Sequence, residues 1–268
     1  MRLRLWQIDA FTDRVFGGNP AAVVPLDAWL PDGVLRAIAA ENNLSETAFL
    51  VRDARGWWIR WFTPTVEIEL CGHATLASAF VVLSHLEPGS SAVTFASQSG
   101  PLTVSRGPGA TLEMTFPRRA PAPSGAPDAL VGALGRSPVE TLRSRDLLAV
   151  LDRAEDVRAL SPDLAAVARL DAQGLIVTAP GDGGADFVSR YFAPQVGIDE
   201  DPVTGSAHCT LAPYWAARLG KRRLVAHQVS ARGGRLECED LPERDAVRIA
   251  GRAAQYLAGE IEVSAALG

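Results

Sequence analysis

Residues 60–68 read Arg-Trp-Phe-Thr-Pro-Thr-Val-Glu-Ile, and residues 190–198 read Arg-Tyr-Phe-Ala-Pro-Gln-Val-Gly-Ile. The two stretches are identical at five of nine positions, and both carry an aromatic residue at a sixth, Trp61 or Tyr191. Each combines a strand-like segment with a proline turn. An internal match of this kind predicts that one structural unit occurs twice in the chain.

A second match follows after a shift of three residues. Gly72-His73-Ala74 aligns with Gly205-Ser206-Ala207. Each glycine opens a stretch of small, mostly apolar residues, 72–83 and 205–219, which is typical of a helix buried on every side. Both copies therefore share the order strand, proline turn, glycine and buried helix, and we interpret the chain as two copies of one fold facing each other.

The remaining pattern is a mixture of strands and helices. From Pro31 onward, apolar residues recur at helical spacing and predict an amphipathic helix that ends near Asn42-Asn43. Short apolar or alternating runs predict strands at 3–8, 21–26, 47–52, 57–62, 93–95, 102–105, 112–116, 147–151, 174–179 and 187–192, with further strands to the C-terminus.

Residues 117–127 contain four prolines. Proline fixes φ and lacks a backbone N–H, so this stretch predicts a stiff, extended connector. It divides the chain into a first domain, 1–117, and a second domain, 118–268, and the interpretation allows the final strand to return to the first domain.

Composition excludes several classes of protein. The chain has 268 residues, of which 47% are hydrophobic, and a formal net charge of −5, so it is globular and has no broad basic surface for nucleic acid. Arg118-Arg119 and Lys221-Arg222-Arg223 are short runs typical of solvated faces. No apolar run is long enough for a membrane span and no export signal is visible, so we expect a cytoplasmic protein that does not bind membranes.

The sequence shows no motif for a bound metal or cofactor. Its three cysteines, Cys71, Cys209 and Cys238, form no Cys-x-x-Cys pair, so we expect reduced thiols and no metal site. The signatures of nucleotide-binding proteins, zinc peptidases, serine hydrolases and dinucleotide-binding proteins are absent. This favours an enzyme without a cofactor, or a protein that is not an enzyme.

The two glycine-opened helices suggest an anion site. Helices related by a pseudo-twofold axis would point their N-termini into one cleft between the domains, where unpaired N–H groups favour a carboxylate. Gly72 and Gly205 would let that carboxylate approach the backbone closely. Either glycine alone is more simply explained as a tight turn, but two at matched positions favour binding.

Four polar residues are candidates for the chemistry. Glu46 precedes an apolar strand, where partial burial suits a carboxyl group to proton transfer, although its local sequence alone favours a solvated turn. His73 opens the first buried helix, whose N-terminus is expected to keep the ring neutral; the alternative is capping of that helix. Asp201 and Ser206 flank Gly205 and suit either helix capping or an acid/base group and a hydroxyl donor.

Cys71 and Thr204 occupy equivalent positions in the two copies. Two thiols there could remove and return a proton on opposite faces of a stereocentre. A threonine hydroxyl is far too weak an acid for this role, so racemisation by two thiols is disfavoured. We interpret Cys71 as a packing residue.

At this level the chain resembles the PhzF-like proteins of the diaminopimelate epimerase superfold. The resemblance implies an α+β fold of two pseudo-symmetric domains, each a curved, mostly antiparallel sheet wrapped around a central helix, with the site between them. The matching stretches follow one another over most of the chain: 16–24 (FGGNPAAVV), 43–49 (NLSETAF), 60–64 (RWFTP), 71–75 (CGHAT) and 201–208 (DPVTGSAH).

The resemblance also implies a cofactor-independent isomerase that acts on a small carboxylate-bearing substrate. The family's phenazine-pathway member isomerises trans-2,3-dihydro-3-hydroxyanthranilate, and family members are commonly homodimers. By motif, Glu46 corresponds to the acid/base that moves the proton. The other implied site residues are His73, Asp201 and Ser206 as supporting groups, Gly72 and Gly205 as the carboxylate cradle, and Asn19 as a loop residue facing the cleft.

Three alternatives remain open. An amino-acid epimerase or a dehydratase could use the same cradle, and a non-catalytic ligand-binding or interaction protein could keep the fold. Loss of Glu46, His73 or Asp201 would mark the last of these, and all three are present.

Overall fold

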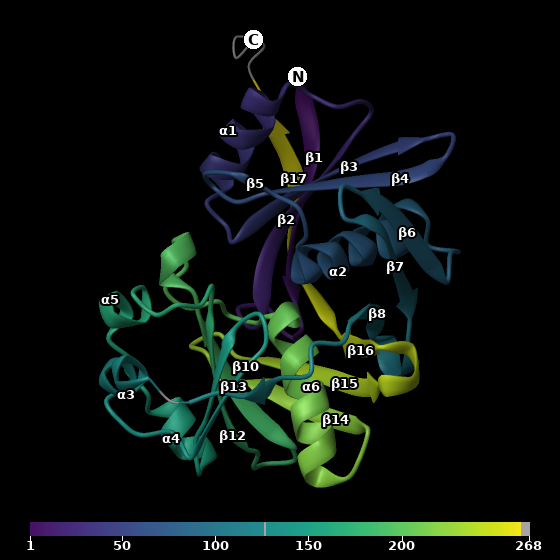
Figure 1. The fold of residues 1–268 in the computed structure, drawn as a ribbon. Helices are drawn as coiled ribbons and strands as arrows, with labels where there is room; N and C mark the ends of the chain where they lie inside the picture. Colours follow the sequence, from purple (N-terminus) through teal and green to yellow (C-terminus); the bar gives the residue numbers. More distant parts are fainter. Residues whose placement is uncertain (126, 264–268) are drawn as a thin grey trace. The chain divides into compact units, whose positions relative to one another are not determined.

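A computed structural model describes residues 1–125 and 127–263 (Figure 1). The chain divides into unit 1, which comprises Met1–Met114 and the chain from Ala250 onward, and unit 2, Thr115–Ile249. The chain leaves unit 1 within β8 (Leu112–Pro117) and returns to it within β16 (Ala246–Gly251). Unit 1 therefore contains residues from both ends of the sequence.

Unit 1 contains two α-helices among its strands. In chain order its elements are β1 (Arg2–Ala10), β2 (Asn19–Leu26), α1 (Asp32–Asn42), β3 (Glu46–Asp53), β4 (Gly56–Phe62), β5 (Glu67–Ile68), α2 (Gly72–Val81), a π-helical turn (Val82–Leu86), β6 (Ala92–Ser97), β7 (Gly100–Arg106), a 3₁₀ turn (Pro108–Ala110), β8 and, after the return, β17 (Ala253–Glu262). β17 pairs with β1 along its length, in antiparallel register.

Unit 2 contains α6 (Gly205–Leu219), the longest of the helices among the described residues. Its other elements are β9 (Ala122–Pro123), α3 (Asp128–Leu134), β10 (Glu140–Arg143), β11 (Leu147–Val150), α4 (Ala154–Arg158), α5 (Leu164–Val167), β12 (Leu175–Pro180), β13 (Phe187–Phe192), β14 (Arg223–Gln228), β15 (Gly234–Leu241) and β16, with 3₁₀ turns at Pro194–Val196 and Pro242–Arg244. The sequence did not predict α3, α4 or α5, which have seven, five and four residues.

The order of strand pairing is the same in both units. In unit 1, β1–β2 is antiparallel, β2–β3 parallel, β3–β4 antiparallel, β4–β6 parallel and β6–β7 antiparallel. In unit 2, β10–β11, β11–β12, β12–β13, β13–β14 and β14–β15 repeat these orientations one by one. The prediction of two copies of one α+β fold is confirmed.

The repeated sequence motif builds the same interaction in both units. The Arg60 guanidinium donates two hydrogen bonds, of 2.7 and 2.6 Å, to the carboxylate of Glu67. Arg190 makes the same bidentate pair with Glu200, at 2.7 and 2.8 Å. Each guanidinium also lies over a phenylalanine ring two residues later, at 5.1 Å for Phe62 and 4.9 Å for Phe192. The identical positions of the repeat thus serve a common structural role.

The central helix of unit 1 is buried along most of its length. All residues of α2 except Gly72 and Phe80 are buried. Its small side chains let the strands approach closely. Two buried hydroxyls donate to backbone carbonyls of the same helix region, Thr75 to Cys71 at 2.6 Å and Ser78 to Ala74 at 2.7 Å. The predicted helix 72–83 ends as an α-helix at Val81 and continues as the π-helical turn.

The central helix of unit 2 contains Pro213 in its interior. Proline has no N–H for the carbonyl four residues earlier, that of Cys209. The backbone N–H of Arg119 donates to this carbonyl instead, at 3.0 Å. Because Arg118 also donates to the Asp245 carbonyl and Ser124 to the Thr141 carbonyl, both at 2.9 Å, the proline-rich stretch is bonded to unit 2.

The amphipathic helix predicted from Pro31 is confirmed as α1. Its apolar face packs on the strands of unit 1, in a core that includes Leu35, Phe49 and Phe62. Asn43 ends the helix in the left-handed region, at φ 48°. Among the described helices, none combines the length and the apolar composition that a membrane span requires.

The bidentate pair of unit 2 should contribute measurably to stability. In the wild type, the Arg190 guanidinium donates hydrogen bonds to the Glu200 carboxylate and, at 2.5 Å, to the Leu160 carbonyl. Arg190→Met removes these donors and leaves both acceptors without them. Because these acceptors are partly buried, we expect the free energy of unfolding to fall by about 2–4 kcal/mol in urea titrations.

Arg2→Met is the matched control. Arg2 pairs with Glu262 at 3.2 Å, but the two side chains are 72% and 78% exposed, so little change in stability is expected. Equal losses in the two variants would contradict a structural role for the repeated pair.

Candidate active site

Four side chains of unit 1 gather where two parallel strands and the central helix begin. Asn19 is the first residue of β2 and Glu46 the first of β3. Because β2 and β3 are parallel, with Ala21 opposite Glu46, the beginnings of both strands lie at one edge of the sheet. Cys71 immediately precedes α2, and His73 is the second residue of that helix.

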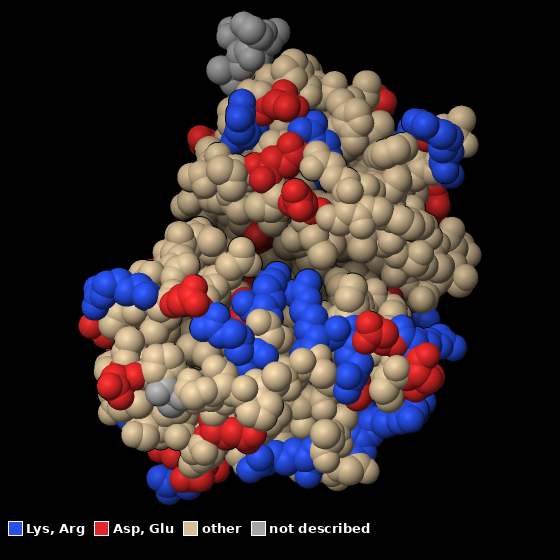
Figure 2. Space-filling view, in the orientation of Figure 1, with Lys and Arg blue, Asp and Glu red and all other residues tan. Residues whose placement is uncertain are grey.

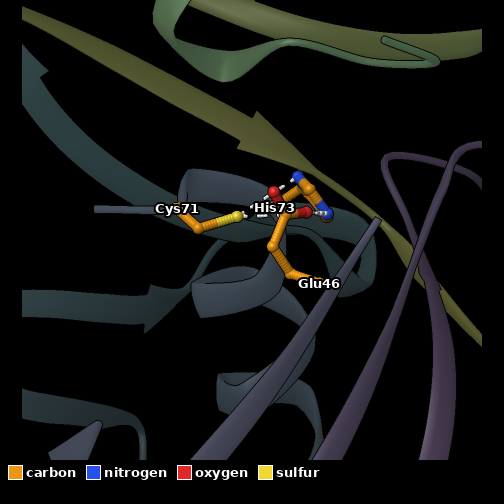
Figure 3. Close-up of side chains that lie close together, drawn as sticks. All are labelled: Glu46, Cys71 and His73. Carbon is orange, nitrogen blue, oxygen red and sulfur yellow. Dashed lines mark hydrogen bonds and ion pairs between the residues drawn. The ribbon is translucent and has the colours of Figure 1, made fainter. Parts of the chain in front are cut away.

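The imidazole of His73 is at the centre of the cluster. Its Nε2 lies 2.9 Å from Oε2 of Glu46, and its Nδ1 lies 3.5 Å from Sγ of Cys71 and 3.2 Å from Nδ2 of Asn19. Figure 3 shows the Glu46, Cys71 and His73 side chains converging. Asn19 is fully buried and the other three residues are 6% exposed, so these contacts are largely shielded from water.

Burial and mutual charge shift the protonation of this cluster. Burial raises the pKa of Cys71 to about 11, and the Glu46 carboxylate adds to the rise. Burial alone would lower the pKa of His73, but the charges of Cys71 and Glu46 outweigh it and hold the pKa well above its usual range.

This result corrects the expectation for His73. The sequence predicted a ring kept neutral by the helix N-terminus. Interactions with Cys71 and Glu46 raise the pKa of His73 despite its burial, which favours the protonated ring over the neutral one. Cys71 is buried, as expected of a packing residue, but it also contacts the His73 ring.

The beginning of α2 has no side-chain cap. Cys71, at the capping position, makes no capping hydrogen bond with its side chain. The first N–H groups of a helix have no partners within the helix, and such groups favour a bound anion. A carboxylate held there would lie beside His73 and within the neighbourhood of Glu46.

The predicted residues of unit 2 form a separate hydrogen-bonded group before α6. Thr204 donates from its hydroxyl to the Asp201 carboxylate at 2.5 Å, and its N–H donates to Gln228 Oε1 at 2.8 Å. Gln228 in turn donates to the Asp201 carbonyl at 2.7 Å. Thr204, at the capping position of α6, makes no capping hydrogen bond with its side chain.

Ser206 has an arginine partner that the sequence did not indicate. Arg145 donates to the Ser206 hydroxyl at 3.3 Å and to the buried Asp146 carboxylate at 3.2 Å. Arg145 lies in the turn between β10 and β11, far from Ser206 in the sequence, and no motif links the two positions. Gly205 opens the helix, and a Cβ at this position would meet no atom within 4 Å.

The two units differ in their titratable groups at equivalent positions. The repeat aligns Cys71 with Thr204 and His73 with Ser206. Strand register gives the counterpart of Glu46: Thr47 pairs with Phe62, and Leu175 pairs with Phe192, so Glu46 corresponds to Gly174. The thiol, imidazole and carboxylate of unit 1 are therefore a threonine, a serine and a glycine in unit 2.

The short basic runs are largely ion-paired. On the face shown in Figure 2, acidic side chains lie among the basic ones. Four of the five basic residues in the runs have an acidic partner: Arg118 with Asp240 at 2.7 Å, Lys221 with Asp186 at 2.5 Å, Arg222 with Glu243 at 3.1 Å and Arg223 with Glu239 at 3.3 Å. Residues 221–223 are exposed, as expected of a solvated face, whereas Arg118 and Arg119 are only partly exposed and Arg118 pairs with the buried Asp240, so the expectation is wrong for the first run.

Comparisons with known proteins identify similar sequences and folds. The family model described as phenazine biosynthesis-like protein (PhzC-PhzF) matches residues 8–259. A Pseudomonas aeruginosa protein named as an uncharacterized isomerase is 52% identical over 263 residues, which cover 98% of this chain and 100% of that protein.

Solved structures give the same result. A phenazine biosynthesis protein of the PhzF family from Enterococcus faecalis is 45% identical, with a TM-score of 0.95, and the match covers 98% of this chain and 100% of that one. A structure described as a predicted epimerase from Pseudomonas aeruginosa is 25% identical, with a TM-score of 0.73 and the same coverage. The epimerase-like fold expected from the sequence is confirmed.

The charge on His73 should depend on Glu46. In Glu46→Gln the carboxylate that helps to raise the pKa of His73 is gone while burial still lowers it, so we expect the pKa of His73 to be lower than in the wild type. Ring chemical shifts followed by NMR from pH 5 to pH 9 measure this directly. In the wild type, the raised pKa stabilises the fold fully below the unfolded value, and this contribution is lost as the pH rises through the folded value.

His208 provides an internal control in both proteins. Burial lowers its pKa to about 4, so its ring should remain neutral throughout the titration. A His73 ring that titrates at the same pH in wild type and Glu46→Gln would contradict the charge pair.

Proposed function

The chain belongs to the phenazine biosynthesis-like (PhzC/PhzF) family, and on this premise we propose that it is a cofactor-independent isomerase with Glu46 as its acid/base. The substrate is a small carboxylate-bearing compound, either an amino acid or a cyclic unsaturated acid. The reaction moves a proton from one carbon of the substrate to another. Glu46 carries the proton, and the carbon that loses it lies next to a carboxylate or a conjugated system.

One observation carries this proposal. Glu46 is a 6% exposed carboxylate that contacts the His73 imidazole at 2.9 Å, next to the uncapped beginning of a helix. A shielded carboxylate of this kind suits proton transfer to and from carbon, because water does not compete for its oxygen atoms.

The proposed reaction has two steps. The Glu46 carboxylate takes a proton from one substrate carbon, and the electron pair of that C–H bond enters the conjugated system. The protonated carboxyl group then returns the proton to a second carbon, which restores Glu46. His73 stays protonated throughout, holds the carboxylate in position and places positive charge near the negative charge that develops on the substrate.

The N–H groups at the start of α2 are the proposed binding site for the substrate carboxylate. Gly72 brings no side chain between the ligand and these N–H groups. In unit 2, Asp201, Gly205 and Ser206 remain predicted site residues, with Ser206 as a hydroxyl donor.

The alternative of epimerisation by two thiols has little support. It needs a second acid/base of comparable strength, and the unit 2 positions that correspond to Glu46, Cys71 and His73 hold glycine, threonine and serine. A single carboxylate can remove the proton from one carbon and return it to another on the same face of the substrate. Such a reaction needs no second acid/base group.

Solvent deuterium exchange tests the proposal. The wild type, incubated in D₂O with a panel of cyclic unsaturated amino acids and related carboxylates, should incorporate deuterium at carbon in at least one of them. Glu46→Gln cannot accept the proton, so we expect this exchange to fall by about 10²–10⁴-fold, measured by mass spectrometry and NMR.

Glu41→Gln is the matched control, because it makes the same chemical change at an exposed position at the end of α1. It should exchange at the wild-type rate. The assignment of Glu46 is wrong if Glu46→Gln, shown to be folded by its thermal unfolding, exchanges as fast as Glu41→Gln.

A further inference from the structure

The same corner of unit 1 has the ligand set of a metal site. Glu46, Cys71 and His73 offer an oxygen, a sulfur and a nitrogen, and these donor atoms all lie within 4.8 Å of one another. Carboxylate, thiolate and imidazole together are ligands of zinc, whereas calcium and magnesium prefer oxygen alone. No spacing motif indicates the site, because its ligands come from β3, the residue before α2, and α2 itself.

The spacing of the donors is close to that of a tetrahedral site. Zinc bonds of about 2.3 Å to sulfur and 2.0–2.1 Å to nitrogen and oxygen place neighbouring ligands roughly 3.3–3.6 Å apart. In the structure, Sγ of Cys71 lies 3.5 and 4.0 Å from the two ring nitrogens of His73, and Nε2 of His73 lies 2.9 Å from Oε2 of Glu46. With Nε2 as the ring ligand, the two distances to nitrogen each differ from the tetrahedral values by about half an ångström, and the sulfur and the carboxylate oxygen lie within 4.8 Å of each other.

The charges of the cluster also match a divalent cation. With Cys71 and Glu46 ionised and His73 neutral, the three ligands carry a charge of −2, which one Zn²⁺ neutralises in a largely buried setting. Oε2 of Glu46 is buried and, among the described residues, accepts no hydrogen bond of good geometry, although it lies beside His73. A cation bound there would supply the missing partner.

We propose that Glu46, Cys71 and His73 bind a thiophilic divalent cation, represented by Zn²⁺, with one coordination position open, and that the bound cation inhibits the protein. Binding exchanges protons for metal: Zn²⁺ replaces the thiol proton of Cys71 and the imidazolium proton of His73, and two protons leave to solvent. If His73 binds through Nε2, its Nδ1–H needs an acceptor, and the side-chain amide of Asn19, beside Nδ1, would supply its oxygen after a flip of the amide group. Inhibition rests on the proposed function, whereas binding does not.

Spectroscopic titration tests the binding. The full chain, treated with a chelator and then titrated with Co²⁺, should develop a thiolate-to-metal absorption band that saturates at one equivalent and disappears when Zn²⁺ is added. Calorimetry in buffers of different ionisation enthalpy should show proton release. Cys71→Ser should abolish the band, and both Cys71→Ser and His73→Gln should weaken Zn²⁺ binding at least tenfold.

Cys209→Ser is the control, because Cys209 is also a buried, unpaired cysteine but lies in α6 of unit 2. It should keep the band and the affinity of the wild type. A band that persists in Cys71→Ser, a band that is lost in Cys209→Ser, or no binding by the wild type would each overturn the site. Because His73→Gln keeps the thiol, it tests the site independently of the folding of Cys71→Ser.

Deuterium exchange separates this inference from the proposed function. The chelator-treated protein should exchange at its full rate, and one equivalent of Zn²⁺ should suppress exchange by at least tenfold. Full exchange in the zinc-loaded protein would overturn inhibition alone. If the wild type does not bind zinc but Glu46→Gln loses exchange, the metal site is overturned and the proposed isomerase function stands. If the wild type binds zinc but Glu46→Gln exchanges at the wild-type rate, the assignment of Glu46 as acid/base is overturned and the metal site stands.

Discussion

The candidate site depends on the burial of a helix whose first turn has no side-chain cap. Every buried helix begins with N–H groups that lack partners within the helix, and burial prevents free access of water to them. In α2 the residue before the helix is a cysteine, which makes no capping hydrogen bond. Polar side chains from neighbouring elements lie close to this end of the helix and contact the His73 ring. The beginnings of β2 and β3 provide Asn19 and Glu46 at this place.

Burial also explains why the titratable groups of this site lie in direct contact with one another. A carboxylate in a shielded position is costly unless a positive charge accompanies it. His73, on the first turn of α2, provides that charge at 2.9 Å, and the raised pKa of its ring is the electrostatic counterpart of this contact. The pair is thus stabilised by the two groups together, and neither would be as favourable in this environment without the other.

Much of the fold could be predicted from the sequence, because its strongest signals are local. Glycine followed by small residues identified α2 and α6, and apolar alternation identified most strands. The repeat predicted the shared strand order, which the paired registers confirm. The short helices α3–α5 were missed because four to seven residues contain too few turns for a helical period to appear. The contact of Glu46 with His73 was also beyond local reasoning, since it follows from strand register. The raised pKa of His73 was missed for the same reason, because it comes from contacts with Cys71 and Glu46 that local sequence does not show.

The divergence of the two copies bears on the kind of reaction that the fold supports. A fold made of two similar units begins with the same backbone at both helix N-termini, and an epimerase with two bases would keep a titratable group in each. Here the thiol, imidazole and carboxylate of unit 1 correspond to Thr204, Ser206 and Gly174, none of which ionises near neutral pH. Even the space is used differently, since a Cβ at Gly174 would lie 2.1 Å from the Tyr191 hydroxyl, so the position of the carboxylate in unit 1 is filled by an aromatic side chain in unit 2. The positions equivalent to Glu46, Cys71 and His73 thus hold no second acid/base group, which supports the proposal of proton transfer by a single carboxylate.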